Sequence, residues 1–215
     1  MLSCTSGDAR ASSTSPIVLM LGLDGGALLA CADARRRADT RDGAAGKTKL
    51  LYHMKLGPLT QLTRGNVDFE PTAAMNYEVV KVVSQGSKFH MHVWDLSGNV
   101  HLRSMWQHYC TSVRVDAVFF VVDANDKARF DEAREALQQV LHSPALAQAV
   151  KLVILNVKGA DAEEQTALAQ HLGVPEAHRS IRVFEVNPED NNRGVQAALE
   201  WVCHRLVDER GIATS

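Results

Sequence analysis

Long hydrophobic runs, paired cysteines and a surplus of charge of either sign are all missing from this sequence. No apolar run reaches the roughly 18 residues that a membrane-spanning helix needs, so no transmembrane segment is expected. The four cysteines have no paired spacing, which is typical of reduced thiols in a cytosolic protein. A net charge of −2 gives no reason to expect a surface for nucleic acid.

Signals for lipid attachment are also missing. Leu2 stands where N-myristoylation needs a glycine, and 211–215 contain no cysteine for prenylation. Residues 1–15 are rich in Ser, Thr and Ala, lack the charge order of a secretory signal and are expected to be a disordered tail. We therefore expect any membrane contact to be peripheral, through acylation of Cys4 or through a partner protein.

What the sequence does contain is the pattern of one folded domain. Its 215 residues are 46% hydrophobic, enough for a sizeable core. Apolar strand patterns alternate with amphipathic helix patterns, which predicts an α/β fold. We expect a doubly wound, mostly parallel six-stranded sheet with one antiparallel hairpin strand, in a domain at 16–210 followed by a tail at 211–215. The predicted strands are 17–23, 77–83, 89–94, 115–122, 152–155 and 181–186, and the predicted helices are 47–56, 101–110, 128–142, 161–172 and 193–208.

Two short motifs flank the segment 26–44. Gly22-Leu23-Asp24-Gly25 ends the first strand, and Ala45-Gly46-Lys47-Thr48 opens the first helix. Joined directly, they form a phosphate-binding loop. In such a loop, glycines let backbone N–H groups close on phosphates, a lysine reaches the β and γ oxygens, and a threonine holds Mg²⁺. The sequence thus predicts a P-loop NTPase whose loop is interrupted.

The interrupting segment, 26–44, is in frame and cuts the motif cleanly. Nineteen extra residues can loop outward only if Gly25 and Ala45 return to bonding distance. Two explanations stay open: a genuine insertion, or a retained intron or gene-model error that is absent from the mature protein. A tryptic peptide from within 26–44 in mass spectra of the native protein would exclude the second explanation.

Further candidate contacts follow in chain order. Thr72 precedes the predicted hairpin, and Asp95 ends its second strand, three residues before Gly98. Because open α/β sheets bind ligands at the carboxyl ends of their strands, these residues and the loop are expected to meet there. Asp95 suits a carboxylate that holds Mg²⁺ through water, and the Gly98 N–H suits a contact to the γ-phosphate.

Together, these stretches resemble the ADP-ribosylation-factor-like (Arf/Arl) small GTPases. The resemblance covers 17–25 and 45–208. Beside the two loop halves, it rests on Leu51-Tyr52-His53-Met54-Lys55-Leu56-Gly57, Pro71-Thr72, Val93-Trp94-Asp95, Trp106-Gln107-His108-Tyr109, Val121-Val122-Asp123-Ala124-Asn125-Asp126 and Phe130-Asp131-Glu132-Ala133-Arg134-Glu135-Ala136-Leu137.

By this resemblance, 58–76 correspond to switch I, 95–112 to switch II, and 77–94 to a hairpin that shifts register when GTP binds. The resemblance implies GTP/GDP and Mg²⁺ as cofactors, with Thr48, Thr72 and Asp95 at the metal. It also implies effectors, an exchange factor and a GTPase-activating protein that contact Met75, Trp94 and Tyr109, where the family has an aromatic triad. The remaining implied nucleotide-binding residues are Gly22, Asp24, Gly25, Ala45, Gly46, Lys47, Gly98, Asn156 and Lys158.

The sequence departs from the family at two further points. Asn99 replaces the glutamine that orients the attacking water, which predicts slow GTP hydrolysis with Gly98 and Asn99 as the catalytic pair. In the base-reading motif Asn-Lys-x-Asp, Asn156 is kept, but Val157 and Gly159 replace the lysine and the aspartate. Guanine selectivity is therefore expected to fall.

The predicted function is a GTP-dependent switch in vesicle or membrane traffic, in the cytoplasm or peripherally on Golgi or other endomembranes. The alternative is a pseudo-GTPase, a binding scaffold with impaired or no guanine-nucleotide binding. A third option is a P-loop protein that has moved to another nucleotide.

Overall fold

A computed structural model describes 15–23, 45–57, 72, 75–157, 162–175, 178–188, 190 and 193–210. The predictions for 1–14, for Asp24 and Gly25, for 26–44 and for Lys158 lie outside these residues. The observed elements are β1 (Ile17–Gly22), α1 (Lys47–Leu56), β2 (Met75–Ser84), β3 (Ser87–Leu96), α2 (Ser104–Ser112), β4 (Ala117–Asp123), η4 (Lys127–Arg129), α3 (Phe130–Leu141), η5 (Pro144–Leu146), β5 (Val150–Asn156), α4 (Ala162–His171), β6 (Ile181–Val186) and α5 (Val195–Arg210).

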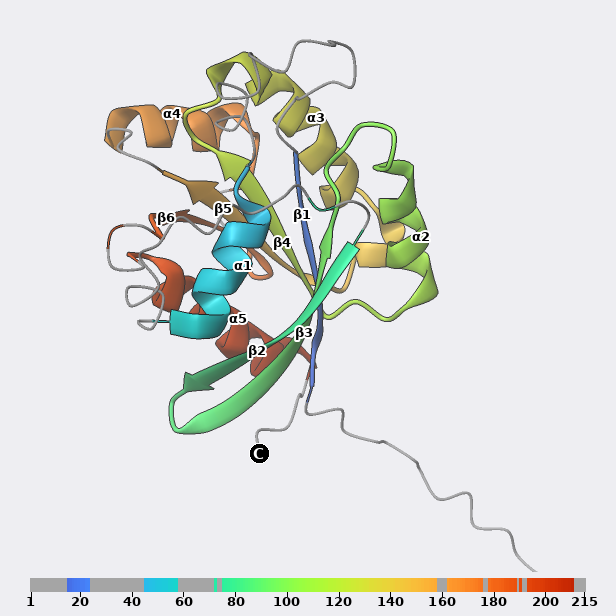
Figure 1. Cartoon of the computed structure of the whole chain (residues 1–215), viewed down its shortest axis with the longest axis vertical. Coiled ribbons are helices and arrows are strands. Elements are labelled where there is room, and N and C mark those ends of the chain that lie inside the picture. Colours follow the sequence, from blue (N-terminus) through green and yellow to red (C-terminus); the bar gives the residue numbers. More distant parts are fainter. Residues whose placement is uncertain are drawn as a thin grey trace, which may run out of the picture.

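The sheet has six strands in the order β2-β3-β1-β4-β5-β6 (Figure 1). Only β2 and β3 pair antiparallel, and the other pairs are parallel. The predicted fold class is therefore confirmed. Every residue of β4 and β5 is buried, as expected for central parallel strands that helices cover on both faces.

Two hydrophobic cores lie on opposite faces of the sheet. One packs α1 and α5 against residues such as Phe119 and Ile154, and the other packs α2, α3 and α4 against residues such as Phe120 and Leu155. Alternate residues of each strand enter alternate cores because side chains in a strand point to opposite faces. No helix in the described part of the chain is both long and apolar enough to cross a membrane.

The hairpin of β2 and β3 closes through a two-residue turn. Gln85 and Gly86 both have positive φ, 50° and 78°, as a type I′ turn requires. Ser84 pairs with Ser87, and the ladder continues to Met75 opposite Leu96. The hairpin projects from the sheet in Figure 1, and among the described strands β2 is an edge with one neighbour.

Two local details differ from what the sequence suggests. Asp126 precedes the helix predicted at 128–142 and so could cap it, but its carboxylate instead accepts a hydrogen bond from Arg129 Nε at 2.6 Å, and a 3₁₀ turn precedes α3. The helix expected at 101–110 begins only at Ser104, because turns occupy 100–103.

Candidate functional site

The two halves of the interrupted loop lie together. Ala45 N donates a hydrogen bond to Leu23 O at 3.3 Å, so the chain before and after the segment 24–44 meets at one point. Gly46 follows in a left-handed conformation, with φ 73°. The end of β1 and the start of α1 therefore adjoin as a phosphate-binding loop requires.

Lys47 is the first residue of α1 and is buried within this loop. Its Nζ donates to Gly22 O at 3.1 Å and to Leu23 O at 3.3 Å. Gly22 has φ +146°, and a Cβ at that position would lie 2.3 Å from Val121 O, so only glycine fits there. Since no side chain caps the N-terminus of α1 in the described part of the chain, its first N–H groups point toward the loop as anion donors.

Three oxygen-bearing side chains meet beside Lys47. Thr48 Oγ1 lies 2.9 Å from Thr72 Oγ1 and donates to Asp95 Oδ2 at 2.5 Å, and Thr72 Oγ1 lies 3.4 Å from the same carboxylate oxygen. Mg²⁺ prefers such hard oxygen ligands at 2.0–2.1 Å, which places neighbouring octahedral ligands roughly 2.9 Å apart. The three residues therefore fit a magnesium site in chemistry, and the two threonine hydroxyls also have the spacing of neighbouring ligands.

The segment after Asp95 is held by hydrogen bonds within itself. Asn99 Oδ1 accepts from His101 N at 3.0 Å, so the Asn99 side chain forms the turn that leads into α2. Trp106 Nε1 donates to Ser97 O at 2.9 Å. These bonds fix the backbone on both sides of Gly98.

Arg103 is a residue that the sequence reasoning missed. Its Nε donates to Gly98 O at 2.7 Å, and its guanidinium pairs with Glu132 of α3 at 2.6 Å. Arg103 thus ties the Gly98 loop to α3. No sequence pattern joins two residues so far apart along the chain, so only the fold reveals this pair.

The base-reading end of the site is less complete. Asn156 ends β5 and is 3% exposed, and its Nδ2 donates to Ala45 O at 3.1 Å, which ties this end to the loop. Its buried Oδ1 has no hydrogen-bond partner among the described residues, so an acceptor remains for a ligand donor. Val157 is 1% exposed and packs into the α3/α4 core, so its side chain does not face a bound base.

The predicted partner-binding residues fall on one surface. Trp94 and Tyr109 contact each other edge to face, with ring centroids 5.6 Å apart. Met75 lies on the neighbouring strand and is 41% exposed. Tyr77, which the sequence reasoning missed, is 46% exposed and contacts Trp94 edge to face at 6.1 Å. Because Tyr77 lies directly opposite Trp94 in the hairpin, the predicted turn could have identified it as a member of the same surface.

Other reactive groups do not form a site in the described part of the chain. No group of three or more His, Cys, Asp or Glu residues there could hold a metal ion. Burial raises the pKa of the Cys110 thiol to about 11. Burial, with a smaller contribution from the charge of Glu200, raises the pKa of the Cys203 thiol to about 12. Neither thiol is a nucleophile near neutral pH.

Comparison with known proteins agrees with this geometry. One structure with a similar fold is the Arl6 (BBS3) small GTPase from Trypanosoma brucei, solved with the nucleotide analogue GppNp. It is 21% identical to this chain, with a TM-score of 0.62, over 91% of this chain and 99% of that one. The sequence model of the ADP-ribosylation factor family matches residues 42–206, a match that starts after the first strand and most of the intervening segment. This chain therefore belongs to the ADP-ribosylation factor family.

Proposed function

We propose that this protein is a GTP-dependent switch in vesicle or membrane traffic that hydrolyses GTP slowly. Membership of a small-GTPase family supports GTP binding. The observation that carries the proposal is the hydrogen bond between Leu23 and Ala45, because it rejoins the phosphate-binding loop despite the intervening segment.

In this proposal, the phosphates bind at the N-terminus of α1. The Gly46 amide and Lys47 hold the β- and γ-phosphates, with Asp24 and Gly25 completing the loop. Thr48, Thr72 and Asp95 hold Mg²⁺, which neutralises the charge that develops on the phosphoryl oxygens during transfer. The short distances within this oxygen cluster support the assignment.

Slow hydrolysis follows from Asn99. The Gly98 N–H is assigned to the γ-phosphate, and Asn99 to the attacking water. Asn99 is one methylene shorter than the family's glutamine, and its Oδ1 already accepts the His101 amide. This hydrogen bond holds the Asn99 side chain in the turn, so the side chain reaches the attacking water less readily than a longer glutamine would, and the intrinsic rate is expected to be low.

Effectors and regulators are proposed to contact the surface of Met75, Trp94 and Tyr109. Trp94 and Tyr109 are half-buried beside the exposed Met75, and Trp and Tyr side chains are enriched among the residues that contribute most to binding at protein interfaces. We place the protein in the cytoplasm and peripherally on Golgi or other endomembranes, held there by a partner or by Cys4 acylation.

A binding scaffold without a nucleotide cycle is the second candidate, and the base end favours it. Val157 is buried in the core instead of covering a base, and Gly159 replaces the guanine-reading aspartate. Hydrogen–deuterium exchange of 75–96 separates the two candidates. A switch is expected to show different protection of the hairpin amides in the presence of GDP and of GppNp. Identical exchange with either nucleotide would favour the scaffold.

A further inference from the structure

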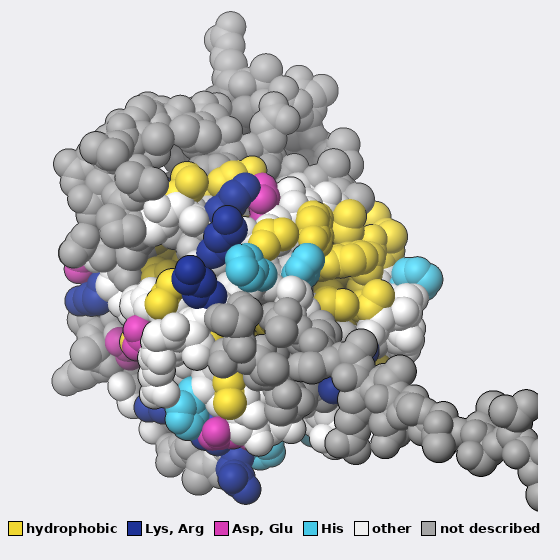
Figure 2. All heavy atoms as spheres, turned by 90° about the horizontal axis from the view of Figure 1, so that it is seen from below, with side chains coloured by type: hydrophobic (Ala, Val, Ile, Leu, Met, Phe, Trp, Pro, Cys, Tyr) yellow, Lys and Arg dark blue, Asp and Glu magenta, His cyan; other side chains and the backbone are white. Residues whose placement is uncertain are grey.

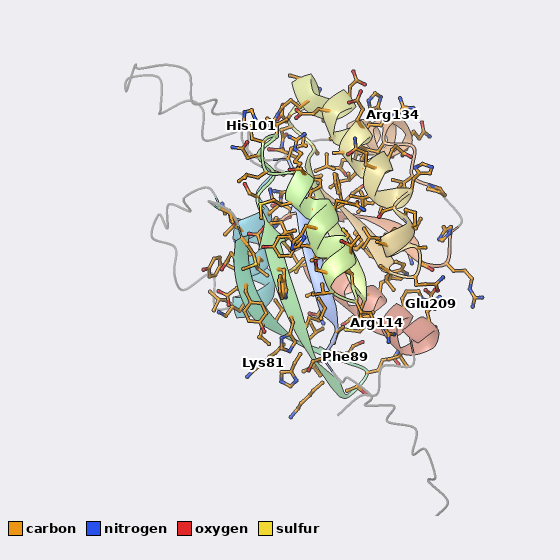
Figure 3. The ribbon with its side chains drawn as sticks, turned by 90° about the vertical axis from the view of Figure 1, so that its right-hand side faces the viewer. Lys81, Phe89, His101, Arg114, Arg134 and Glu209 are labelled. Atoms are coloured by element: carbon orange, nitrogen blue, oxygen red, sulfur yellow. The ribbon has the colours of Figure 1, made fainter. Side chains whose placement is uncertain are left out.

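Among the described residues, one face of the β2–β3 hairpin lies outside both hydrophobic cores over most of its length. Side chains alternate across a strand, so one set points into the α1/α5 core and the other points away from it. In Figure 3, α2 lies over the sheet beside the hairpin, and Lys81 marks the projecting end. We call the outward set, with Tyr109 of α2, the hairpin face: Met75, Tyr77, Val79, Lys81, Val83, Lys88, His90, His92, Trp94 and Tyr109.

The hairpin face exposes apolar and aromatic side chains along its length. Met75 and Tyr77, at its sheet end, are 41% and 46% exposed, and Val83, beside the turn, is 59% exposed. Tyr77 contacts Trp94, which contacts Tyr109, so three rings form one continuous row. Figure 2 shows a broad hydrophobic patch on this side of the molecule, bordered by two histidines and by Lys or Arg side chains.

The charges on this face are all of one sign. From Val79 to Val115 the chain has only one of its 25 acidic residues, Asp95, and that residue is fully buried in the oxygen cluster. Lys81 and Lys88 are exposed near the hairpin turn, where Lys81 pairs across the strands with His90 and Lys88 pairs with Val83. The face is therefore aromatic toward the sheet and basic toward the turn.

Side chains of the two strands of the hairpin face are also joined. The Tyr77 hydroxyl of β2 bonds to His92 Nδ1 of β3, and the two rings lie 5.8 Å apart. The hairpin face therefore presents one surface that extends across both strands. From Met75 to Val83 this surface runs about 27 Å at the usual rise of a strand, a length that about five turns of α-helix match.

We propose that the hairpin face binds an acidic amphipathic helix of a partner protein. This inference rests on the proposed function, because it names the chemistry of the partner at the proposed effector surface. The apolar side of the helix packs on Tyr77, Trp94 and Tyr109, and its Glu or Asp residues lie over Lys81 and Lys88. Complementary charge of this kind fixes orientation and speeds association.

An anionic membrane is a poorer match to the same surface. Lipid-binding patches typically cluster about four to eight Lys or Arg residues, whereas the hairpin face has two. The rings of Tyr77, Trp94 and Tyr109 stand edge to face with one another, an arrangement that offers several apolar side chains separate places to pack.

A displayed peptide library tests the proposal. Each peptide carries a fixed apolar stripe at helical spacing, and all its remaining positions are randomised between Glu and Lys in equal proportion. The bait is the full chain, with GppNp and Mg²⁺ and, separately, without nucleotide. Selected peptides are expected to be enriched in Glu at the end that lies over the hairpin turn, and their binding is expected to weaken as salt rises.

Variants of the bait sharpen the test. Reversing both charges, with Lys81→Glu and Lys88→Glu, is expected to weaken the selected acidic peptide roughly tenfold and to favour Lys-bearing peptides instead. Tyr77→Ala is expected to weaken binding by a similar factor. Arg134→Glu on α3, at the opposite end of the molecule in Figure 3, is the matched control and is expected to leave binding unchanged.

Several outcomes would overturn the proposal. These are equal Glu and Lys in the selected peptides, enrichment of Lys, no selected peptide, or flotation with phosphatidylserine-containing vesicles that the charge reversal abolishes. If the proposed GTP-dependent switch is wrong but the hairpin face binds acidic helices, the result is different. Glu-rich peptides are then selected equally with and without GppNp, and nucleotide titration shows no binding.

Discussion

The two ends of the candidate nucleotide site differ in how much of the family's chemistry they keep. At the phosphate end, Lys47, Thr48 and Asp95 lie within hydrogen-bonding distance of their expected neighbours. At the base end, Asn156 is the predicted residue that the structure describes, and Val157 lies in the core. Phosphates and Mg²⁺ would supply most of the charge-based affinity, whereas the base would supply selectivity. We therefore propose that the site binds nucleotides through the phosphate end and discriminates poorly between bases, since Gly159 stands where the family has an aspartate.

The largest expected effect is at the phosphate end. Lys47→Ala removes a charge-assisted contact to two phosphates, so the affinity for a fluorescent GTP analogue should fall roughly 10- to 150-fold. Lys49→Ala, on the same helix, is the control and should bind nearly as the unaltered chain does. Equal losses in both variants would mean that the phosphates do not lie at Lys47.

At the base end, we expect a substitution to increase the preference for GTP, by a smaller factor than the loss of affinity in Lys47→Ala. Competition titrations should find GTP and ATP bound within about tenfold of each other, because no aspartate reads the guanine edge. Gly159→Asp should then favour GTP by roughly 10- to 100-fold, since a carboxylate accepts two hydrogen bonds from guanine. Gly159→Asn supplies similar size without charge and should not do so. A strong preference of the unaltered chain for GTP over ATP would contradict the view that the base end gives little selectivity.

The hydrolysis step gives the next effect. Asn99→Gln lengthens the side chain that is assigned to the attacking water, so single-turnover GTP hydrolysis should speed up about tenfold at unchanged affinity. An unchanged rate would show that Asn99 does not limit the reaction.

The smallest effect concerns the connection between Gly98 and α3. Glu132→Gln removes the carboxylate that pairs with Arg103 and so loosens the loop whose Gly98 N–H is assigned to the γ-phosphate. Ion pairs near the surface contribute about 0.2–1 kcal/mol, so release of GppNp should accelerate by up to about fivefold. Glu135→Gln, exposed on the same helix, should leave release unchanged. Slower release in Glu132→Gln would show that this pair opposes nucleotide retention.

Most of the fold was predictable because long apolar strands and amphipathic helices dominate the pattern. The buried run that became β4 and the stripe of α5 were both expected, and α1 begins and ends where it was predicted. Boundaries near 100–103 were not predictable, because the turn there depends on hydrogen bonds of Asn99 with residues that follow it.

The candidate site was predictable only where its residues lie close together in the chain. Lys47 and Thr48 follow from their motif, whereas no sequence pattern shows that Ala45 returns to Leu23 after an intervening segment. Closing a loop of that length costs on the order of 2 kcal/mol, which a folded domain tolerates. The burial of Val157 does follow from strand alternation, because Val153 and Leu155 enter the same core.

The most direct test is calorimetric titration of GTP with and without Mg²⁺, on the full chain and on a version that lacks 26–44. That version joins Gly25 to Ala45 and restores an uninterrupted loop. We expect the full chain to bind GTP only when Mg²⁺ is present, and the shortened version to bind at least as tightly. If neither form shows magnesium-dependent binding, the loop does not hold phosphates and the switch is contradicted.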